Sequence, residues 1–148
     1  MIEKKVKTIS EYNKHCEEHE KLPNLVVIID EIAYMMHDRK LSKEFEANIV
    51  RISQRIRSSG IYLILTTQQT SVEVVTGLIK CNSNARVAFT MHSVEQSLIA
   101  LERSGAERFT GFGDMLFLDS ASFGYAERIQ GTYLSDDEIV KVSNFLRK

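Results

Sequence analysis

The sequence is poor in the residues that mark several classes of protein. Only one of its 148 residues is proline, two are cysteine, and tryptophan is absent. Cys16 and Cys81 lack the paired spacing of a zinc site, which indicates a reduced, cytoplasmic protein without a disulfide framework. Apolar runs reach only five residues, and no apolar core follows the charged N-terminus. We therefore expect neither a membrane segment nor a signal peptide in this chain.

An excess of charge of one sign is also lacking. The net charge is −1, so any contact with nucleic acid must come from a local patch of cations. The hydrophobic fraction of 43% and the charged fraction of 26% are ordinary for a globular protein of this length. The composition therefore predicts a folded domain with a real core and excludes a fibrous or disordered chain.

One apolar segment ends in two adjacent carboxylates. Residues 25–29 are Leu-Val-Val-Ile-Ile, which predicts a strand buried on both faces, and Asp30 and Glu31 follow. The carboxyl edge of an open α/β sheet is where such folds bind ligands. In P-loop NTPases an Asp at this point holds Mg²⁺, and a neighbouring Glu can polarise an attacking water. Taken alone, the segment supports a solvated strand end equally well.

A second apolar segment, residues 61–66, ends in a similar way. It predicts another buried strand that leads to Gln68, whose amide can bind a γ-phosphate or the attacking water; a simple capping role is the alternative. Strands and helices alternate along the chain, which predicts an α/β fold with a mostly parallel sheet flanked by helices and a C-terminal β-hairpin. The other expected strands are 86–90, 115–118 and 125–130. Helices are expected over 9–20, 41–58, 72–80 and 94–103, and a last helix begins with a capping box at 135–138. Ser10 is expected to cap the first helix and Gly60 to end the second.

Several segments, in this order, resemble FtsK/SpoIIIE DNA translocases from their Walker B region onward. The resemblance covers nearly the whole chain and implies a partial RecA-like P-loop NTPase core. It implies an N-terminal helical segment, 1–24, followed by the C-terminal half of the motor domain, 25–148. The segments that carry it are 9–13, 22–33, 60–68, 75–80, 86–89, 105–107, 113–118 and 134–138.

The resemblance implies a homo-hexameric ring that hydrolyses ATP to move double-stranded DNA, in chromosome segregation, cell division or mobile-element transport. It implies that Asp30 holds Mg²⁺, that Glu31 activates water, and that Gln68 contacts the nucleotide with them. Arg86 matches a family arginine and is our candidate for an arginine finger; an ordinary cation at a strand edge is the alternative. Full-length members are often anchored in a membrane through an N-terminal region that this chain does not contain.

Contact with DNA is expected near residues 76–80. In the family this segment lies close to the central pore, so Thr76 and Lys80 are the candidate DNA-binding residues, with Lys80 as the stronger phosphate contact. Arg51 and Arg55 lie one turn apart on an expected helix, and we favour a solvated helix face for them.

Two departures from the family pattern affect the expected site. Gln69 and Thr70 stand where the family usually has Arg-Pro, so the loop after the second strand loses a cation and a rigid turn. Gln96 and Leu98 stand where the family usually has the Asp and Arg of an Asp-Ser-Arg run, which puts any nucleotide or interface role of that run in doubt.

The largest departure is that no Gly-x-x-x-x-Gly-Lys-Ser/Thr motif occurs, since no glycine precedes a lysine. We therefore expect ATP and Mg²⁺ to bind only where a P-loop is supplied from elsewhere, and we expect the chain to be inactive alone. In RecA-like sheets the P-loop strand lies between the strand ending at Gln68 and the strand starting at Arg86. Its absence predicts a closed-up sheet, pairing with another chain, or marginal stability.

Other functions were weighed against the motor. A non-enzymatic, truncated relative that docks onto a complete translocase ring is the main alternative. A helicase of the Asp-Glu-Ala-x type is disfavoured because Ile32 separates Glu31 from Ala33. A metal-dependent nuclease would need a further acidic residue and a lysine after a following strand, which the pattern does not supply.

Overall fold

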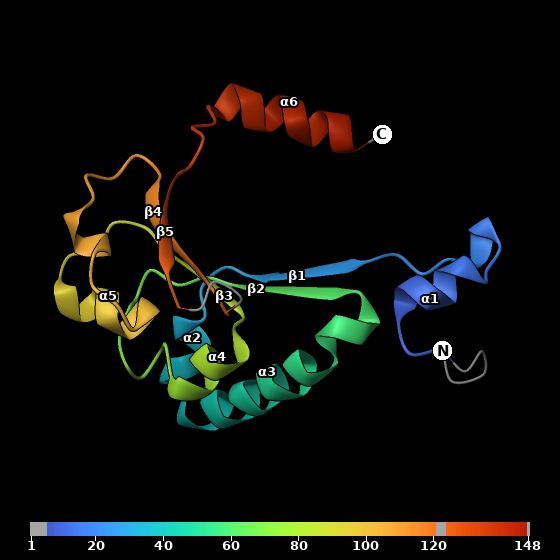
Figure 1. Ribbon diagram of the computed structural model, residues 1–148, viewed down its shortest axis with the longest axis horizontal. Coiled ribbons are helices and arrows are strands. Elements are labelled where there is room, and N and C mark those ends of the chain that lie inside the picture. The colour runs from blue at the N-terminus through green and yellow to red at the C-terminus, as the bar shows by residue number, and fades with distance from the viewer. Residues whose placement is uncertain (1–5, 121–123, 148) are drawn as a thin grey trace. The chain divides into compact units, whose positions relative to one another are not determined.

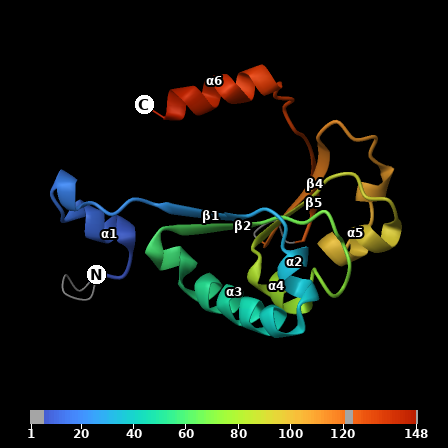
Figure 2. The same ribbon diagram turned by 180° about the vertical axis from the view of Figure 1, so that it is seen from behind.

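The computed structural model describes residues 6–120 and 124–147, shown from opposite sides in Figures 1 and 2. These residues form two compact units that divide between Asn84 and Ala85. The boundary expected after residue 24 stays a prediction. Each unit has its own sheet and its own core, so the two are described separately.

The first unit is built on two parallel strands. Its elements are α1 (Ile9–Lys14), η1 (Glu18–Glu20), β1 (Leu25–Ile29), α2 (Ala33–His37), α3 (Arg39–Ser59), β2 (Ile61–Leu65) and α4 (Gly77–Asn82). β1 pairs with β2 so that Val27 lies opposite Leu63. Helices α2, α3 and α4 lie on the same side of the strand pair (Figure 1), where Ile32, Met36 and Ile79 are buried beneath it. Burial of these apolar side chains is the main force that holds the strands to the helices.

The other face of this strand pair is open to solvent. Val26 and Ile28 of β1 are 54% and 63% exposed, and their partners Tyr62 and Ile64 of β2 are 56% and 45% exposed. The prediction that the strand over 25–29 is buried on both faces is therefore wrong, and the second strand, predicted as buried, is also exposed on this face. Long β-branched runs are typical of strands with helices on both faces, whereas among the described residues of this unit the helices cover one face alone.

Helix α3 confirms the helix expected over 41–58 and its end at Gly60. Asp38 opens it by accepting hydrogen bonds from the backbone N–H groups of Lys40 and Leu41 at 2.8 and 3.0 Å. Gly60 closes it in the left-handed region at φ 62°. The chain then turns directly into β2.

Two other helices differ from expectation. The helix expected over 9–20 is shorter: Thr8, not Ser10, caps α1, and a separate 3-10 turn follows. The helix expected over 72–80 begins at Gly77, because the Thr76 side chain accepts a hydrogen bond from the N–H of Ile79 and fixes the N-terminus there. Both errors concern which hydroxyl caps the helix, a choice that nearby Ser and Thr residues leave open in the sequence.

Replacing Gly60 by Ala is expected to destabilise the first unit by roughly 2 kcal/mol or more, because the left-handed conformation alone costs a non-glycine residue about 1–2 kcal/mol. A Cβ there would also lie 2.7 Å from both Ile9 Cγ2 and Asn24 Oδ1. Urea unfolding followed by circular dichroism measures the loss. Gly77→Ala is the matched control: a Cβ there meets no atom within 4 Å. An equal loss in both variants would contradict the prediction.

The second unit is antiparallel. It contains β3 (Ala85–Ala88), α5 (Val94–Leu101), η2 (Ala106–Arg108), β4 (Asp114–Asp119), β5 (Ala126–Gln130) and α6 (Asp136–Leu146). The strand order is β3-β4-β5, and the β4–β5 pairing confirms the expected hairpin. Leu101 is fully buried with Ala88, Ala106 and Leu118 to form the core. The capping box at Ser135 and Glu138 is confirmed at the start of α6.

The two sheets are not joined by strand pairing in the described part of the chain. β2 pairs only with β1, and β3 pairs antiparallel with β4. The three outcomes expected for a sheet that lacks its P-loop strand stay predictions. Parallel pairing is confined to the first unit.

Candidate functional site

The carboxylate of Glu31 lies where β1 and β2 both end, and the loop after β2 closes over it. The backbone N–H of Gln68 donates a hydrogen bond to Oε2 at 2.8 Å. The backbone N–H of Ala33 donates to Oε1 at 3.0 Å, and the hydroxyl of Thr67 donates to the same atom. The parallel pairing brings this about, because it aligns the ends of the two strands at one edge.

These three donors keep Glu31 ionised. Burial on its own would raise the pKa of Glu31, but the hydrogen bonds from Gln68, Thr67 and Ala33, together with the nearby His37, outweigh it and hold the pKa below its usual value. A carboxylate offers about four lone-pair positions. Among the described residues only Gln68 donates to Oε2. The other lone pair of Oε2 accepts no hydrogen bond from the described residues.

Asp30 lies beside this carboxylate and is exposed. The hydroxyl of Thr66 donates to its backbone carbonyl and lies 3.4 Å from its Oδ1. Mg²⁺ is usually held by one or two carboxylates, with waters and phosphate oxygens completing its shell. Asp30 suits that role as a single ligand. No group of three His, Cys, Asp or Glu residues that would hold a metal by itself occurs in the part of the chain that the structure describes.

Gln68 joins Asp30 and Glu31 at the same edge. Its backbone N–H is committed to Glu31, while its side chain is exposed and makes no hydrogen bond to the other described residues. The amide group is thus exposed to solvent in a residue whose backbone binds Glu31. The structure brings the three predicted residues together, and their roles stay predictions.

His37 was not predicted to belong to this site. Its Nε2 lies 2.8 Å from Oε1 of Gln69, and the N–H of Gln69 donates to the Thr67 hydroxyl at 3.0 Å. The loop that was expected to lose a rigid turn is therefore tied to the end of α2. The two residues are 32 positions apart in the chain, so no local pattern could have paired them.

The expected DNA contacts, Thr76 and Lys80, lie on α4. Thr76 serves as the N-cap of this helix, and its hydroxyl also donates to the carboxylate of Glu46 on α3. Lys80 is half-buried in the last turn of the helix. Thr76 thus has a structural role of its own, and a DNA-binding role for either residue stays a prediction.

Arg86 lies in the second unit and is largely covered. Its side chain is 19% exposed, and it forms an ion pair with Glu102 at 3.0 Å. It also donates to the carbonyl of Ala100 at 3.3 Å, near the C-terminal end of α5. Arg86 would have to leave these partners to reach another subunit. Its role as an arginine finger stays a prediction.

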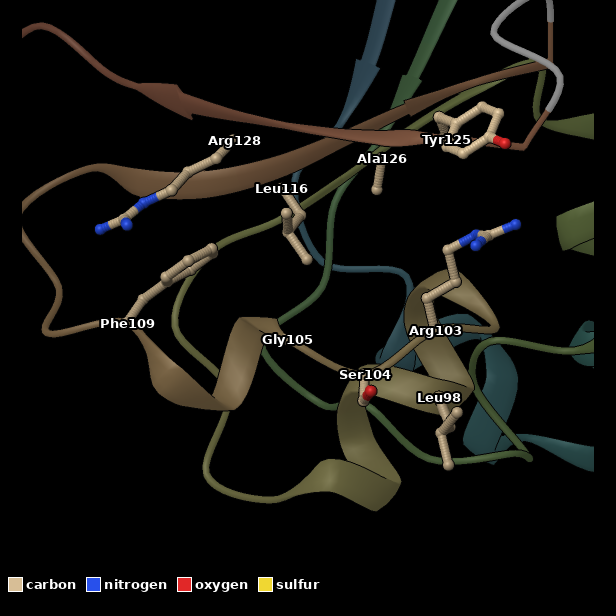
Figure 3. A pocket seen from close by; sticks show the side chains of 9 residues that line it. All are labelled: Leu98, Arg103, Ser104, Gly105, Phe109, Leu116, Tyr125, Ala126 and Arg128. Carbon is tan, nitrogen blue, oxygen red and sulfur yellow. The ribbon is translucent and has the colours of Figure 1, made fainter.

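The second unit also contains an open pocket of about 570 Å³. Figure 3 shows arginine side chains at opposite ends of it, one on β5 and one in the segment after α5, with an apolar floor between them. Asp114 neutralises the first of these, Arg128, through two hydrogen bonds of 2.9 and 2.6 Å. None of the predicted site residues lines this pocket. Its lining residues are Leu98, Arg103, Ser104, Gly105, Phe109, Leu116, Tyr125, Ala126 and Arg128.

The fold is expected to lose stability in acid, because several carboxyl groups have a lowered pKa in the folded state. Hydrogen bonds lower the pKa of Glu107, and those of Arg128 lower that of Asp114, as the loop does for Glu31. The unfolded chain then binds more protons, so the free energy of unfolding rises with pH in this range. The contribution is complete above about pH 4.3, the unfolded value for Glu, and disappears as the pH falls through the folded value.

Urea unfolding midpoints measured between pH 7 and pH 3 test this expectation. The midpoint should fall as the pH drops below about 4.5. Glu31→Gln should show a shallower fall, because it lacks one of the groups that take up a proton on unfolding. A midpoint that does not change between pH 6 and pH 3.5 would contradict the assignment.

Comparison of the sequence with known proteins finds relatives that agree with one another. A sequence profile of the FtsK/SpoIIIE family matches residues 6–72. The DNA translocase SftA of Bacillus subtilis is 44% identical over 145 residues, and the DNA translocase FtsK of Sporosarcina ureae is 42% identical over 139 residues. These matches cover 96% and 93% of this chain but 15% and 17% of the two relatives. The chain thus spans less than a fifth of the length of these proteins.

Solved structures agree on the fold. The pCW3 conjugation coupling protein TcpA, solved as a monomer with ATPγS, is 29% identical and superposes with a TM-score of 0.81 over 99% of this chain and 43% of its own. The type VII secretion ATPase EccC of Thermomonospora curvata is 18% identical, with a TM-score of 0.74 over 88% of this chain and 15% of its own, and shows the fold alone. The fold is that of RecA-like ATPase motor domains.

None of the helices in the described ranges is both long and apolar enough to cross a membrane. The order of strands and helices, the residues at the shared edge of β1 and β2, and these relatives lead to one assignment. This chain belongs to the FtsK/SpoIIIE family, and it corresponds to one part of a RecA-like motor domain within much longer DNA translocases.

Proposed function

We propose that this chain is the Walker B half of an ATP-driven motor that moves double-stranded DNA. In this proposal Glu31 orients the attacking water, Asp30 holds Mg²⁺, and Gln68 contacts the γ-phosphate. The bound Mg²⁺ would neutralise charge on the phosphates. The chain has no P-loop motif, so it cannot anchor a triphosphate and is inactive alone.

One observation carries the proposal. Glu31 is held ionised at the end of a β-strand by three donors, and Asp30, the preceding residue, and Gln68, whose N–H binds Glu31, both have exposed side chains. A carboxylate that only faces solvent at a strand end has no reason to be fixed in one direction by three hydrogen-bond donors, as that of Glu31 is. Fixing that direction before the substrate arrives is how a site avoids reorganisation during the reaction.

The remaining parts of the proposal rest on the family. They are a homo-hexameric ring, a cytoplasmic location, and service in chromosome segregation, cell division or mobile-element transfer. Arg86 is proposed to act on the nucleotide of a neighbouring subunit, and Lys80 and Thr76 are proposed to face the DNA. The relatives named as DNA translocases support DNA as the partner.

A chimeric motor tests the function directly. The matching segment of Bacillus subtilis SftA is replaced by this chain, which is 44% identical to it. We expect the chimera to hydrolyse ATP in the presence of double-stranded DNA, and we expect the chain alone to show no hydrolysis. The assay is phosphate release, with and without DNA, at matched protein concentration.

Two outcomes would overturn the proposal. Hydrolysis by the chain alone that disappears in Glu31→Gln would show that no P-loop is needed. A chimera that forms rings of the same size as SftA but shows no hydrolysis would show that the edge of β1 and β2 does not serve as half of an ATPase site.

A non-enzymatic module that docks onto a complete ring is the second candidate. The open apolar face of β1 and β2 favours it, since Val26, Ile28 and Tyr62 are all more than half exposed. Adding the chain to intact SftA distinguishes the two functions. A docking module would co-sediment with the ring and change its hydrolysis rate, whereas half of a motor would do neither.

A further inference from the structure

We propose that His37 is a positioning residue: its hydrogen bond to Gln69, here called the tie, fixes the loop of residues 66–69 to α2 and thereby orients the side chain of Gln68. The inference rests on the proposed function, because it assigns Gln68 the task of contacting the nucleotide. The tie itself is a property of the fold and can be measured without nucleotide.

The tie is made through Gln69. His37 Nε2 lies 2.8 Å from Oε1 of Gln69, within the normal range of a hydrogen bond. Since the oxygen of an amide only accepts, Nε2 of the imidazole donates, which it can do in the doubly protonated ring and in the Nε2–H tautomer of the neutral ring. The contact therefore does not require a positive charge on the ring.

The loop is held at three successive positions. At its start, the hydroxyl of Thr66 donates to the backbone of Asp30. In the middle, Thr67 and the N–H of Gln68 both donate to Glu31. The contact between His37 and Gln69 supplies the third position, beside the hydrogen bond that the N–H of Gln69 donates to the Thr67 hydroxyl at 3.0 Å.

The helix at the other end of the tie is anchored in the core. Ala33 and Met36 of α2 are only 6% and 8% exposed, and both belong to the buried cluster of the first unit. His37 is the last residue of this helix, directly after Met36. A side chain attached to a packed helix can hold a loop still, whereas a side chain on another loop cannot.

This arrangement restricts the conformation of Gln68. It lies between Thr67 and Gln69, whose side chains are both bonded, while its own side chain has no hydrogen bond among the described residues. Fixing both neighbours restricts the backbone of Gln68 and so the directions its amide can take. A misplacement of about 1 Å in such a group can cost about 100-fold in rate.

His37 also lies close enough to two carboxylates to affect them. It helps to lower the pKa of Glu31, and it acts in the same direction on Glu73 in the segment before α4. Replacing His37 therefore changes charge as well as geometry, and the test has to separate the two effects.

A double-mutant cycle on the isolated chain tests the tie. Amide hydrogen exchange of Gln68 is measured by NMR in the native chain, in His37→Ala, in Gln69→Ala and in the double variant. Each single variant should speed exchange at Gln68 about fivefold, the factor contributed by one ordinary hydrogen bond. The double variant should be no faster than the single ones, because both remove the same contact.

Two control variants separate geometry from charge and from general loss of structure. His37→Gln keeps a side-chain donor without the positive charge and should restore slow exchange at Gln68. His19→Ala removes another exposed histidine of the same unit, whose ring lies 3.6 Å from the Glu17 carboxylate, and should change nothing at Gln68. Independent, multiplicative effects of the two alanine variants, or no rescue by His37→Gln, would overturn the proposal.

The chimeric motor then links the tie to catalysis. His37→Ala should lower kcat while leaving KM for ATP unchanged, and His37→Gln should recover most of the rate. If the double-mutant cycle shows coupling between His37 and Gln69, but His37→Ala leaves kcat of the chimera unchanged, the role of His37 in orienting Gln68 is refuted. A chimera that is inactive even with the native His37 would refute the proposed function and leave the measured tie intact.

Discussion

Replacing Glu31 by Gln in the chimeric motor is expected to lower ATP hydrolysis by about 10²- to 10⁴-fold, the usual contribution of a positioned general base. The amide would offer Oε1 to Thr67 and Ala33, but its NH₂ group would then face the N–H of Gln68. The group at Oε2 would lose its ability to accept a proton from water. Steady-state phosphate release at saturating ATP and DNA measures the effect.

Glu107 provides a matched control for this substitution. Its Oε2 accepts the N–H of Gly105 at 2.7 Å and the hydroxyl of Ser97 at 2.8 Å, so it too is held by both backbone and side-chain donors, two in number against three for Glu31. Glu107→Gln should cost the fold a similar set of hydrogen bonds and leave hydrolysis within a few fold of the native rate. Equal losses of hydrolysis in the two variants would mean that Glu31 is only structural.

Replacing Leu101 by Ala is expected to destabilise the second unit by about 2–5 kcal/mol, the range measured for large-to-small changes in a packed core. Leu101 is 0% exposed and packs with Ala88, Ala106 and Leu118. The cavity left by the missing side-chain atoms adds to the lost transfer free energy, because the surrounding core relaxes only in part. Such a loss is a large part of the stability of a unit of this size.

Leu98→Ala is the control for this second prediction. The two leucines lie on the same helix three positions apart, but Leu98 is 47% exposed. The same change in composition and helix propensity should therefore cost much less there. Urea unfolding followed by circular dichroism gives both values, and equal losses at Leu98 and Leu101 would contradict the assignment of the core.

The strand ends were the part of the site that sequence reasoning could reach. A β-branched run followed by Asp30 and Glu31, and another followed by Gln68, place their polar residues at one edge once the strands pair in parallel. The end of α3 at Gly60 and the capping box at Ser135 were also predictable from local sequence. Each depends on residues that are close in the chain.

The exposure of β1 and β2 could not be predicted from the same pattern. Apolar residues at every position of a strand indicate cover on both faces, and the sequence does not state which segment provides that cover. The antiparallel pairing of β3 was missed because alternation of strands and helices favours parallel neighbours. Both errors arose because patterns that hold for a complete sheet were applied to a chain that contains only part of one.

His37 and Arg86 show why side-chain partners are harder to foresee. The contact of His37 with Gln69 depends on how α2 leaves the core, which follows from packing and not from any local spacing. Arg86 was predicted to be an arginine finger, with an ordinary strand-edge cation as the alternative, and it binds Glu102, a non-glycine residue in the left-handed region at φ 60°. Both partners become adjacent only after the chain has folded.

The open face of β1 and β2 has a consequence for handling the isolated chain. Neither strand carries a charge or a proline within its bounds, and each has one edge without a strand partner among the described residues. Natural sheets usually guard such edges with lysine, proline or a bulge. Solubility should therefore limit every experiment on this chain alone, and light scattering should rise with protein concentration before any assay of its chemistry becomes informative.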